Sequence, residues 1–246
     1  MMRIAGSLLF WGFLVFSSLL LFPIGAMLWL VSTPFDKRRW LMHRFTCFWA
    51  SLYTWLNPVW RVEIEGRERL HEGTPTVLVA NHLSLLDILV LFRLQSHYRW
   101  VSKLENFRVP LIGWNMSLCE YIPLRRGDPA SIRAMMRLCD EALQGGSSIL
   151  MFPEGTRSAT GRLRSFKPGA FQIAVHNQVP VQPILIRGTS EALPKRGFIL
   201  RGRHAITVEI LAPIPPEQFA GTEPEELMAR VQGLFLDELE QATPAR

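Results

Sequence analysis

The segment TVLVANHLSLLD, residues 76–87, sets a titratable imidazole and a carboxylate inside a run that is otherwise mostly apolar. Four of its first five residues are aliphatic and three are β-branched, which predicts a buried strand. Ser84 and Asp87 then have the Ser-x-x-acid spacing typical of a helix N-terminus, so the helix is predicted to begin at Ser84. His82 therefore lies in a strand-to-helix turn. In open α/β sheets ligands bind at such carboxyl ends of strands.

Short runs of strand-forming residues recur along the chain and alternate with helical patterns. Several runs are apolar throughout, which is typical of parallel strands that helices cover on both faces. We therefore predict an α/β fold with a mostly parallel central sheet flanked by helices. The predicted strands are residues 61–65, 76–80, 98–102, 121–124, 148–152, 181–186 and 205–211.

Two of the predicted helices have clear end signals. Asp128 is predicted to cap a helix that starts at Pro129 and stops before Gly145. Its apolar stripe is predicted to hold Ile132, Met135, Met136, Cys139, Ala142 and Leu143. A last helix is predicted to start at the capping-box sequence TEPE, residues 222–225, and to bury Leu227, Val231, Leu234 and Phe235.

The chain carries no charged residue from Ile4 to Phe35, a run of 32 residues. A bilayer-spanning helix needs ~20 apolar residues, whereas the apolar core of a signal peptide has only about 7–15. We predict a membrane-embedded helix, or a hairpin of two short helices that turns at Pro23. Lys37, Arg38 and Arg39 follow the run, which predicts that the rest of the chain is cytoplasmic, at the inner membrane if the cell is bacterial.

A second apolar stretch, residues 45–60, contains three Trp and one Tyr. These rings favour the headgroup level of a membrane, which predicts a helix lying along the bilayer surface. A core helix of the following domain is the alternative. The predicted organisation is thus a membrane-anchoring and interfacial part, residues 1–60, and a cytoplasmic domain, residues 61–246.

The pair His82 and Asp87 forms the candidate catalytic centre. Within one regular helix the two positions would point about 140° apart, but a turn before the helix can fold the imidazole back onto the carboxylate. An aspartate bonded to one ring nitrogen fixes the tautomer and leaves the other nitrogen free to take a proton from a hydroxyl. On these residues alone, a purely structural role in the turn and helix cap is an equal alternative.

A second polar loop, PEGTRS at residues 153–158, follows the predicted strand 148–152. It holds a carboxylate, a flexible glycine, a hydroxyl and Arg157, whose planar guanidinium suits a phosphate. Arg162, Arg164 and Lys167 follow closely and raise the local positive potential. The loop is predicted to bind a phosphate group.

Together these segments resemble one family. NHLSLLD at residues 81–87 and FPEGTRS at residues 152–158 are similar to the motifs of glycerophospholipid acyltransferases, the PlsC-like 1-acylglycerol-3-phosphate acyltransferases. The resemblance extends to blocks within residues 103–125, 161–170 and 179–184. Gln182 stands where this family usually has an apolar residue, and Leu124 where an acidic one is common; we expect both in the wall of the site.

The resemblance implies an enzyme that moves a fatty acyl group from acyl-CoA or acyl-carrier protein to the sn-2 hydroxyl of 1-acyl-sn-glycerol-3-phosphate, which makes phosphatidic acid at a membrane. It implies direct transfer, with His82 as general base and Asp87 as the residue that orients it. It also implies substrate-binding roles for Asn81, Ser84, Lys103, Arg125, Glu154, Gly155, Thr156 and Arg157.

Other function classes are weighed against this one. An acyltransferase for glycerol-3-phosphate or another lysolipid, such as lyso-ornithine lipid, remains an alternative, as does a non-catalytic membrane phospholipid-binding module. The net charge of +6 suits nucleic acid, but the apolar start and the lack of a base-recognition motif argue against it. Three cysteines without a C-x-x-C pair predict neither a zinc site nor a disulfide framework, and no metal or cofactor is expected.

Overall fold

A seven-stranded sheet in the order β1-β7-β6-β2-β5-β3-β4 forms the centre of the molecule. The computed structural model describes residues 2–70, 73–195 and 197–241. Each predicted strand is confirmed to within one residue at either end. The strands are β1 (Trp60–Glu65), β2 (Val77–Ala80), β3 (Tyr98–Lys103), β4 (Ile122–Leu124), β5 (Ser148–Met151), β6 (Val181–Arg187) and β7 (His204–Ile210).

The sheet is mostly parallel, as predicted. Strands β6, β2, β5, β3 and β4 pair in parallel. Strand β7 runs antiparallel to β6, and β1 is parallel to β7. The carboxyl ends of these five consecutive parallel strands therefore meet at one edge of the sheet, so the loops that follow them are neighbours.

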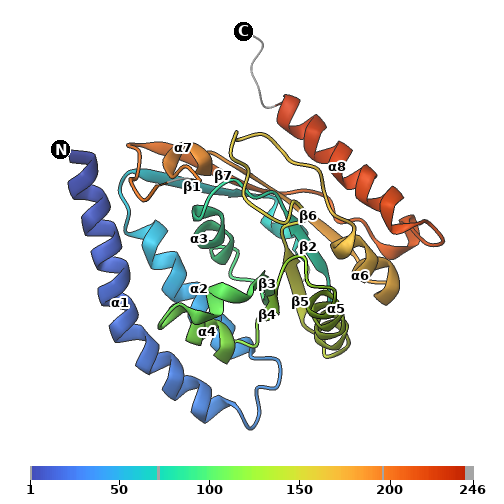
Figure 1. The fold of residues 1–246 in the computed structure, drawn as a ribbon, viewed down its shortest axis with the longest axis horizontal. Coiled ribbons are helices and arrows are strands. Elements are labelled where there is room, and N and C mark those ends of the chain that lie inside the picture. The colour runs from blue at the N-terminus through green and yellow to red at the C-terminus, as the bar shows by residue number, and fades with distance from the viewer. Residues whose placement is uncertain (1, 71–72, 196, 242–246) are drawn as a thin grey trace.

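Helices cover both faces of the sheet (Figure 1). One face carries α2, α3 and α4 with α1 outside them, and the other carries α5, α6 and α8. Their bounds are α1 (Met2–Ser32), α2 (Trp40–Trp55), α3 (Leu86–Phe92), α4 (Ile112–Leu118), α5 (Pro129–Gln144), α6 (Gly169–Asn177), α7 (Thr189–Ala192) and α8 (Pro224–Gln241). Short 3₁₀ turns are η1 (Arg67–Arg69), η2 (Leu104–Arg108) and η3 (Pro216–Gln218).

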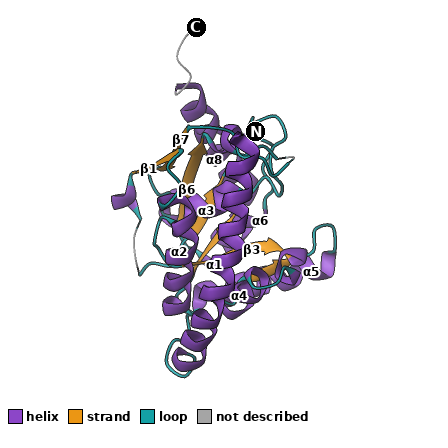
Figure 2. Ribbon diagram, turned by 90° about the vertical axis from the view of Figure 1, so that its left-hand side faces the viewer, coloured by secondary structure: helices purple, strands orange, loops and turns teal. Residues whose placement is uncertain are grey.

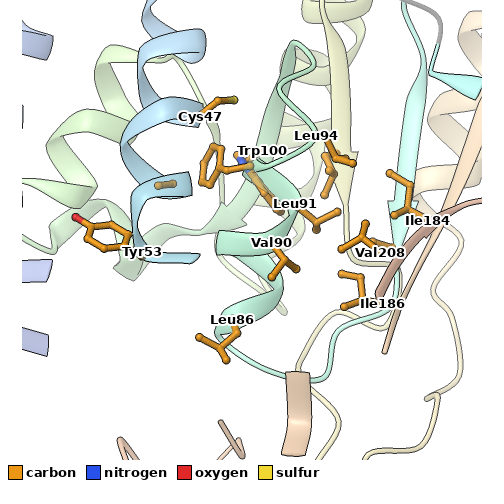
Figure 3. Packing of buried hydrophobic residues seen from close by; sticks show 14 of the residues in the cluster. Cys47, Tyr53, Leu86, Val90, Leu91, Leu94, Trp100, Ile184, Ile186 and Val208 are labelled. Carbon is orange, nitrogen blue, oxygen red and sulfur yellow. The ribbon is translucent and has the colours of Figure 1, made fainter. Parts of the chain in front are cut away.

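The apolar strands supply two cores because successive side chains point to opposite faces of a sheet. In β2, Leu78 and Ala80 join the core under α2 and α3, while Val77 and Val79 join the core under α5 and α6. Figure 3 shows the first core, in which α3 side chains such as Leu91 pack toward β6 and β7. Burying one such side chain stabilises the fold by about 1.5–3 kcal/mol.

The predicted helix ends are correct for α5 and wrong for α8. The Asp128 carboxylate accepts the backbone N–H of Ala130 and Ser131 at 3.0 and 3.4 Å, so it caps α5. In the predicted stripe, Ile132 is the exception, being exposed. Helix α8 begins at Pro224, and the Thr222 hydroxyl donates to an upstream carbonyl instead of capping it, so the predicted capping box does not form.

Helix α1 is continuous through Pro23, so the hairpin alternative is wrong. Among the described residues it is the one helix long and apolar enough to cross a membrane. Figure 2 shows it running along the domain. One face packs inward, with Phe10 against Tyr53 and Trp60, while the other stays exposed and includes Leu8, Phe16 and Met27.

Helix α2 lies between α1 and α3 rather than on the surface. Trp49, Tyr53 and Trp60 are each at most 5% exposed, and Trp49 Nε1 donates to the Tyr53 hydroxyl at 2.6 Å. Of the three Trp and one Tyr that were expected at the headgroup level, Trp55 alone is exposed. Burial therefore favours the core-helix alternative for residues 45–60.

Candidate active site

His82 and Asp87 lie side by side at the carboxyl end of β2. Nδ1 of His82 is 2.8 Å from Oδ2 of Asp87, which confirms the predicted contact. Helix α3 begins at Leu86 rather than at the predicted Ser84, so a longer turn folds the ring back onto the carboxylate. Asp87 is fully buried, whereas 12% of the His82 side-chain surface stays exposed. The imidazole is thus the member of the pair that a substrate can reach.

Both oxygens of Asp87 are held by several donors. Oδ2 also accepts the backbone N–H groups of Leu83 and Ser84 at 2.6 and 2.8 Å, and Oδ1 accepts the Thr189 hydroxyl at 2.5 Å. The carboxylate therefore faces Nδ1 as an acceptor, which favours the tautomer that carries its proton there. Nε2 of His82 has no hydrogen-bond partner in the described parts of the chain. It is free to accept a proton.

The His82 turn is tied to the loop that follows β5. The His82 N–H donates to Glu154 Oε1 at 2.6 Å, and the His82 carbonyl accepts the Ser158 N–H at 2.7 Å. Strands β2 and β5 are adjacent and parallel, which brings their carboxyl ends together. The two motifs of the sequence therefore form one site.

Phe152 sets the plane of the His82 ring. Its ring stacks on the His82 imidazole with centroids 3.9 Å apart and planes 9° from parallel. Trp100 from β3 packs against the far side of the cluster, 5.5 Å from Phe152 between centroids. The stack leaves the imidazole little freedom to rotate away from Asp87.

Glu154 joins the two loops from inside the protein. Oε1 accepts the N–H of His82, Oε2 accepts that of Arg164 at 3.0 Å, and the side chain is buried. These contacts favour a role for Glu154 in positioning the two loops over the predicted role as a substrate ligand. Burial raises the pKa of Glu154 to about 7, although the two N–H donors act in the opposite direction.

This pKa predicts a pH-dependent stability. Because the pKa in the folded state lies above the ordinary value of 4.5, the contribution of Glu154 is full below pH 4.5 and is lost as the pH rises through 7. The loss amounts to about 3 kcal/mol at most. The free energy of unfolding of wild type minus that of Glu154→Gln should therefore fall between pH 5 and 8.

Urea unfolding of detergent-purified protein at several pH values measures this difference. Glu225→Gln, an exposed carboxylate on α8, serves as control and should differ from wild type by the same amount at every pH. A Glu154→Gln difference that is equally constant would contradict the assignment.

The side chains of Asn81 and Ser84 form hydrogen bonds with backbone groups of the protein. The Asn81 amide donates to the Ile186 carbonyl at 2.9 Å and accepts the Ile186 N–H at 2.7 Å, which joins the end of β2 to β6. The Ser84 hydroxyl donates to the Leu193 carbonyl at 2.6 Å. Both side chains are at most 1% exposed. Their contacts favour a positioning role over the predicted binding role.

Gly155, Thr156 and Arg157 form the outer part of the loop after β5. Gly155 has φ 69°, and a Cβ there would lie 3.2 Å from the Lys167 side chain, so glycine lets this lysine cross closely. The Arg157 carbonyl accepts from Lys195 Nζ at 2.6 Å. Its guanidinium has no acidic partner among the described residues, which leaves it available to an anion.

Lys103 and Arg125 follow β3 and β4, at the same edge of the sheet. Both are exposed, and Lys103 Nζ pairs with Glu105 at 3.2 Å. Their strands are second and third from β2, roughly 10 and 14 Å away at ~4.8 Å per strand. The backbone next to Arg157 is closer, since the neighbouring Ser158 N–H bonds the His82 carbonyl directly.

Two residues with clear positions in the site were not assigned a role from the sequence: Phe152 and Thr189. Lys195 belongs to a basic cluster, residues 195–203, for which the sequence left open contact with anionic lipid or donor phosphates, or plain surface charge. Thr189 follows β6, whose carboxyl end lies beside that of β2. A Gly-Thr-Ser sequence after a predicted strand was the available signal for it. Arg196, a member of the basic cluster 195–203, lies outside the described residues.

One departure from the family pattern lies near the amino end of its strand, and the other lies at the carboxyl end of its strand. Gln182 is near the amino end of β6, where its Nε2 donates to the Leu211 carbonyl at 2.6 Å. It lines a cleft of about 310 Å³ at the opposite edge of the sheet. Leu124 packs on the core under α5. The expectation that both lie in the site wall is therefore wrong for Gln182.

Known proteins are similar to this chain in sequence. A 1-acyl-sn-glycerol-3-phosphate acyltransferase of Brassica napus is 43% identical over 162 residues, covering 65% of this chain and 46% of that protein. One of Chlamydomonas reinhardtii is 37% identical over 214 residues, covering 85% and 63%. The chain thus spans about half to two thirds of these relatives' length.

The fold also has a solved counterpart. The crystal structure of the 1-acyl-sn-glycerophosphate acyltransferase PlsC from Thermotoga maritima superposes with a TM-score of 0.79 at 26% identity, covering 99% of this chain and all of that one. The family model described as Acyltransferase matches residues 61–187. This range holds the His82–Asp87 pair and the loop after β5, and by this match the chain belongs to the acyltransferase family.

Proposed function

We propose that this protein transfers a fatty acyl group from a thioester donor to the sn-2 hydroxyl of 1-acyl-sn-glycerol-3-phosphate and so makes phosphatidic acid. The observation that carries the proposal is the His82 imidazole, whose Nδ1 contacts a buried carboxylate while Nε2 has no partner among the residues that the structure describes. The names of the relatives, which specify this acceptor, support the choice of substrate.

In the proposed reaction, Nε2 of His82 takes the proton of the acceptor hydroxyl as its oxygen attacks the thioester carbonyl carbon. The carbon–sulfur bond of the resulting tetrahedral intermediate breaks, and the imidazolium returns the proton to the leaving thiolate. Asp87 orients the ring and stabilises the imidazolium. The ester product and the free thiol balance the equation.

A covalent acyl-enzyme is not part of the proposal. All three thiols, those of Cys47, Cys119 and Cys139, are buried. Burial raises the pKa of Cys119 to about 12 and raises those of the other two as well, so none provides a thiolate nucleophile. The Ser84 hydroxyl near His82 is already donated to a backbone carbonyl.

The acceptor phosphate is assigned to the loop after β5. Arg157 is half-buried, its guanidinium pairs with no acid in the described part of the chain, and its carbonyl accepts from Lys195. A planar guanidinium binds phosphate oxygens in pairs. The acyl donor is acyl-CoA or acyl-carrier protein, which share the same thioester chemistry.

Membrane attachment is assigned to α1. Its outward face is apolar along its length, and its inward face packs on α2 and α4, as where Phe22 meets Trp114 at 5.6 Å between centroids. The active-site domain is therefore held close to the lipid that contains its acceptor. We assign this domain to the cytoplasmic side, following the cations after α1.

An acceptor panel tests the function. Purified wild-type protein should acylate 1-acyl-sn-glycerol-3-phosphate in preference to glycerol-3-phosphate, lyso-ornithine lipid and 1-acyl-sn-glycerol. Arg157→Ala should raise KM for the phosphate-bearing acceptor about 10–100-fold, since a charged hydrogen bond contributes ~1.5–3 kcal/mol, and should leave the phosphate-free acceptor unchanged. Arg133→Ala, an exposed arginine on α5, is the control and should leave KM unchanged.

Transfer to lyso-ornithine lipid alone would reassign the acceptor. If no acceptor is acylated with either acyl-CoA or acyl-carrier protein as donor, the protein is a lipid-binding module and the proposed enzymatic activity is rejected. If Arg157→Ala raised KM equally for 1-acyl-sn-glycerol-3-phosphate and for the phosphate-free 1-acyl-sn-glycerol, Arg157 would not be the phosphate ligand.

A further inference from the structure

A cleft of about 450 Å³ opens between the first turn of α1 and the start of β7, apart from the His82 site. It is lined by Arg3, Glu191, Arg201, Gly202, Arg203 and His204. Helix α7 stands between the two places. Thr189 points inward to Asp87 whereas Glu191 is exposed in the cleft, since residues two apart lie about 200° around a helix axis.

The charge of this cleft is unbalanced. Arg3, Arg201 and Arg203 are exposed, and none of them pairs with an acidic side chain within the described residues. Glu191 is the single acid in the lining. Three arginines gathered around one carboxylate repel one another, so an anion with several oxygens is the ligand class that this lining favours.

An apolar surface continues from the cleft. Phe198 and Ile199 are 68% and 51% exposed, in the loop between α7 and β7. This loop is fastened to α1: Trp11 Nε1 donates to the Phe198 carbonyl at 2.7 Å, and the Leu200 N–H donates to the Ser7 hydroxyl at 2.9 Å. The loop thus extends the apolar outer face of α1, at the end where Arg3 stands.

We propose that this cleft binds the phosphate of an anionic membrane phospholipid, whose acyl chains lie along the apolar face of α1 and on Phe198 and Ile199. A phospholipid carries a phosphate next to hydrocarbon chains, which matches the arginines beside the exposed apolar side chains. A soluble nucleotide has no acyl chain to contact those apolar side chains. Arginines at the end of a membrane-embedded apolar surface lie at headgroup depth, where anionic lipids attract them. The bound lipid fixes the α7–β7 loop to the bilayer.

Native mass spectrometry of the full chain, released from neutral detergent, tests this. The protein is mixed with equal amounts of phosphatidylglycerol and phosphatidylcholine of matched acyl chains, and the bound lipids are counted. Wild type should retain phosphatidylglycerol preferentially. The pair Arg201→Ala and Arg203→Ala should weaken that retention roughly tenfold to thirtyfold, while Lys at both positions should preserve most of it.

The matched control removes two exposed arginines from α5, Arg133→Ala with Arg137→Ala, and should bind as wild type does. Thermal unfolding checks that the cleft variant folds, as its exposed side chains predict. Adenosine 3′,5′-bisphosphate forms a further arm, because it carries the same phosphate chemistry without acyl chains.

Unchanged phosphatidylglycerol retention by the double alanine variant would overturn the proposal. Displacement of the lipid by the bisphosphate, with the same dependence on Arg201 and Arg203, would overturn it too, in favour of a nucleotide-bearing donor. None of these measurements needs turnover, so their outcome is independent of the proposed reaction.

Discussion

Replacing His82 by alanine is expected to lower kcat for acyl transfer by about 10²–10⁴-fold, the usual range for loss of a positioned general base. The ring stacks on Phe152 and is the one side chain, among the described residues, that bonds Asp87 Oδ2, so no neighbouring group takes its place. Steady-state transfer from acyl-CoA, with purified protein in detergent, measures the effect.

His176→Ala is the matched control, because this histidine is exposed in the last turn of α6 on the other side of the sheet. It should keep wild-type kcat. Circular dichroism and thermal unfolding should show that His82→Ala remains folded. Retention of a tenth or more of wild-type turnover by folded His82→Ala protein would refute its role as general base.

Asp87→Asn is expected to lower kcat by a similar factor while the fold is preserved. The amide oxygen can still accept from Leu83, Ser84 and His82, and the amide nitrogen can donate to the Thr189 hydroxyl, which accepts as well as donates. The substitution thus removes the charge and keeps the geometry. In Ser-His-Asp enzymes the same exchange costs about 10⁴-fold in kcat.

Asp87→Ala separates charge from structure, since it leaves buried N–H donors without an acceptor at a cost of about 1–3 kcal/mol each. It should therefore unfold at a clearly lower temperature than Asp87→Asn. The exposed Asp237→Asn on α8 should match wild type in both respects. An Asp87→Asn protein with near wild-type kcat would show that the carboxylate serves the turn alone.

Local patterns predicted the elements and the chemical pair. Strand positions follow from apolar runs of β-branched residues, and α5 follows from an aspartate cap with proline at the first position. The contact of His82 with Asp87 spans five residues, so a turn and a helix start suffice to predict it. Such interactions depend on neighbours in sequence, which the chain itself displays.

Contacts across the sheet were not predictable in the same way. Thr189 meets Asp87 across 102 residues, and Glu154 meets His82 across 72. Both depend on β2 lying between β6 and β5, an order that no local pattern contains. The contacts of Asn81 and Glu154 favour positioning for this reason: each bonds backbone groups of a segment far away in sequence.

The sequence by itself determined the strands, the long apolar helix and a histidine with a carboxylate at a strand end, because periodicity, capping and spacing are local properties of the chain. Only the tertiary structure decided that α2 is a buried helix, that Glu154 and Thr189 hold the His82 turn, and that Arg3 shares a cleft with the distant Arg201 and Arg203. Burial and hydrogen-bond partners are set by which surfaces the sheet brings together. That is a property of the whole fold.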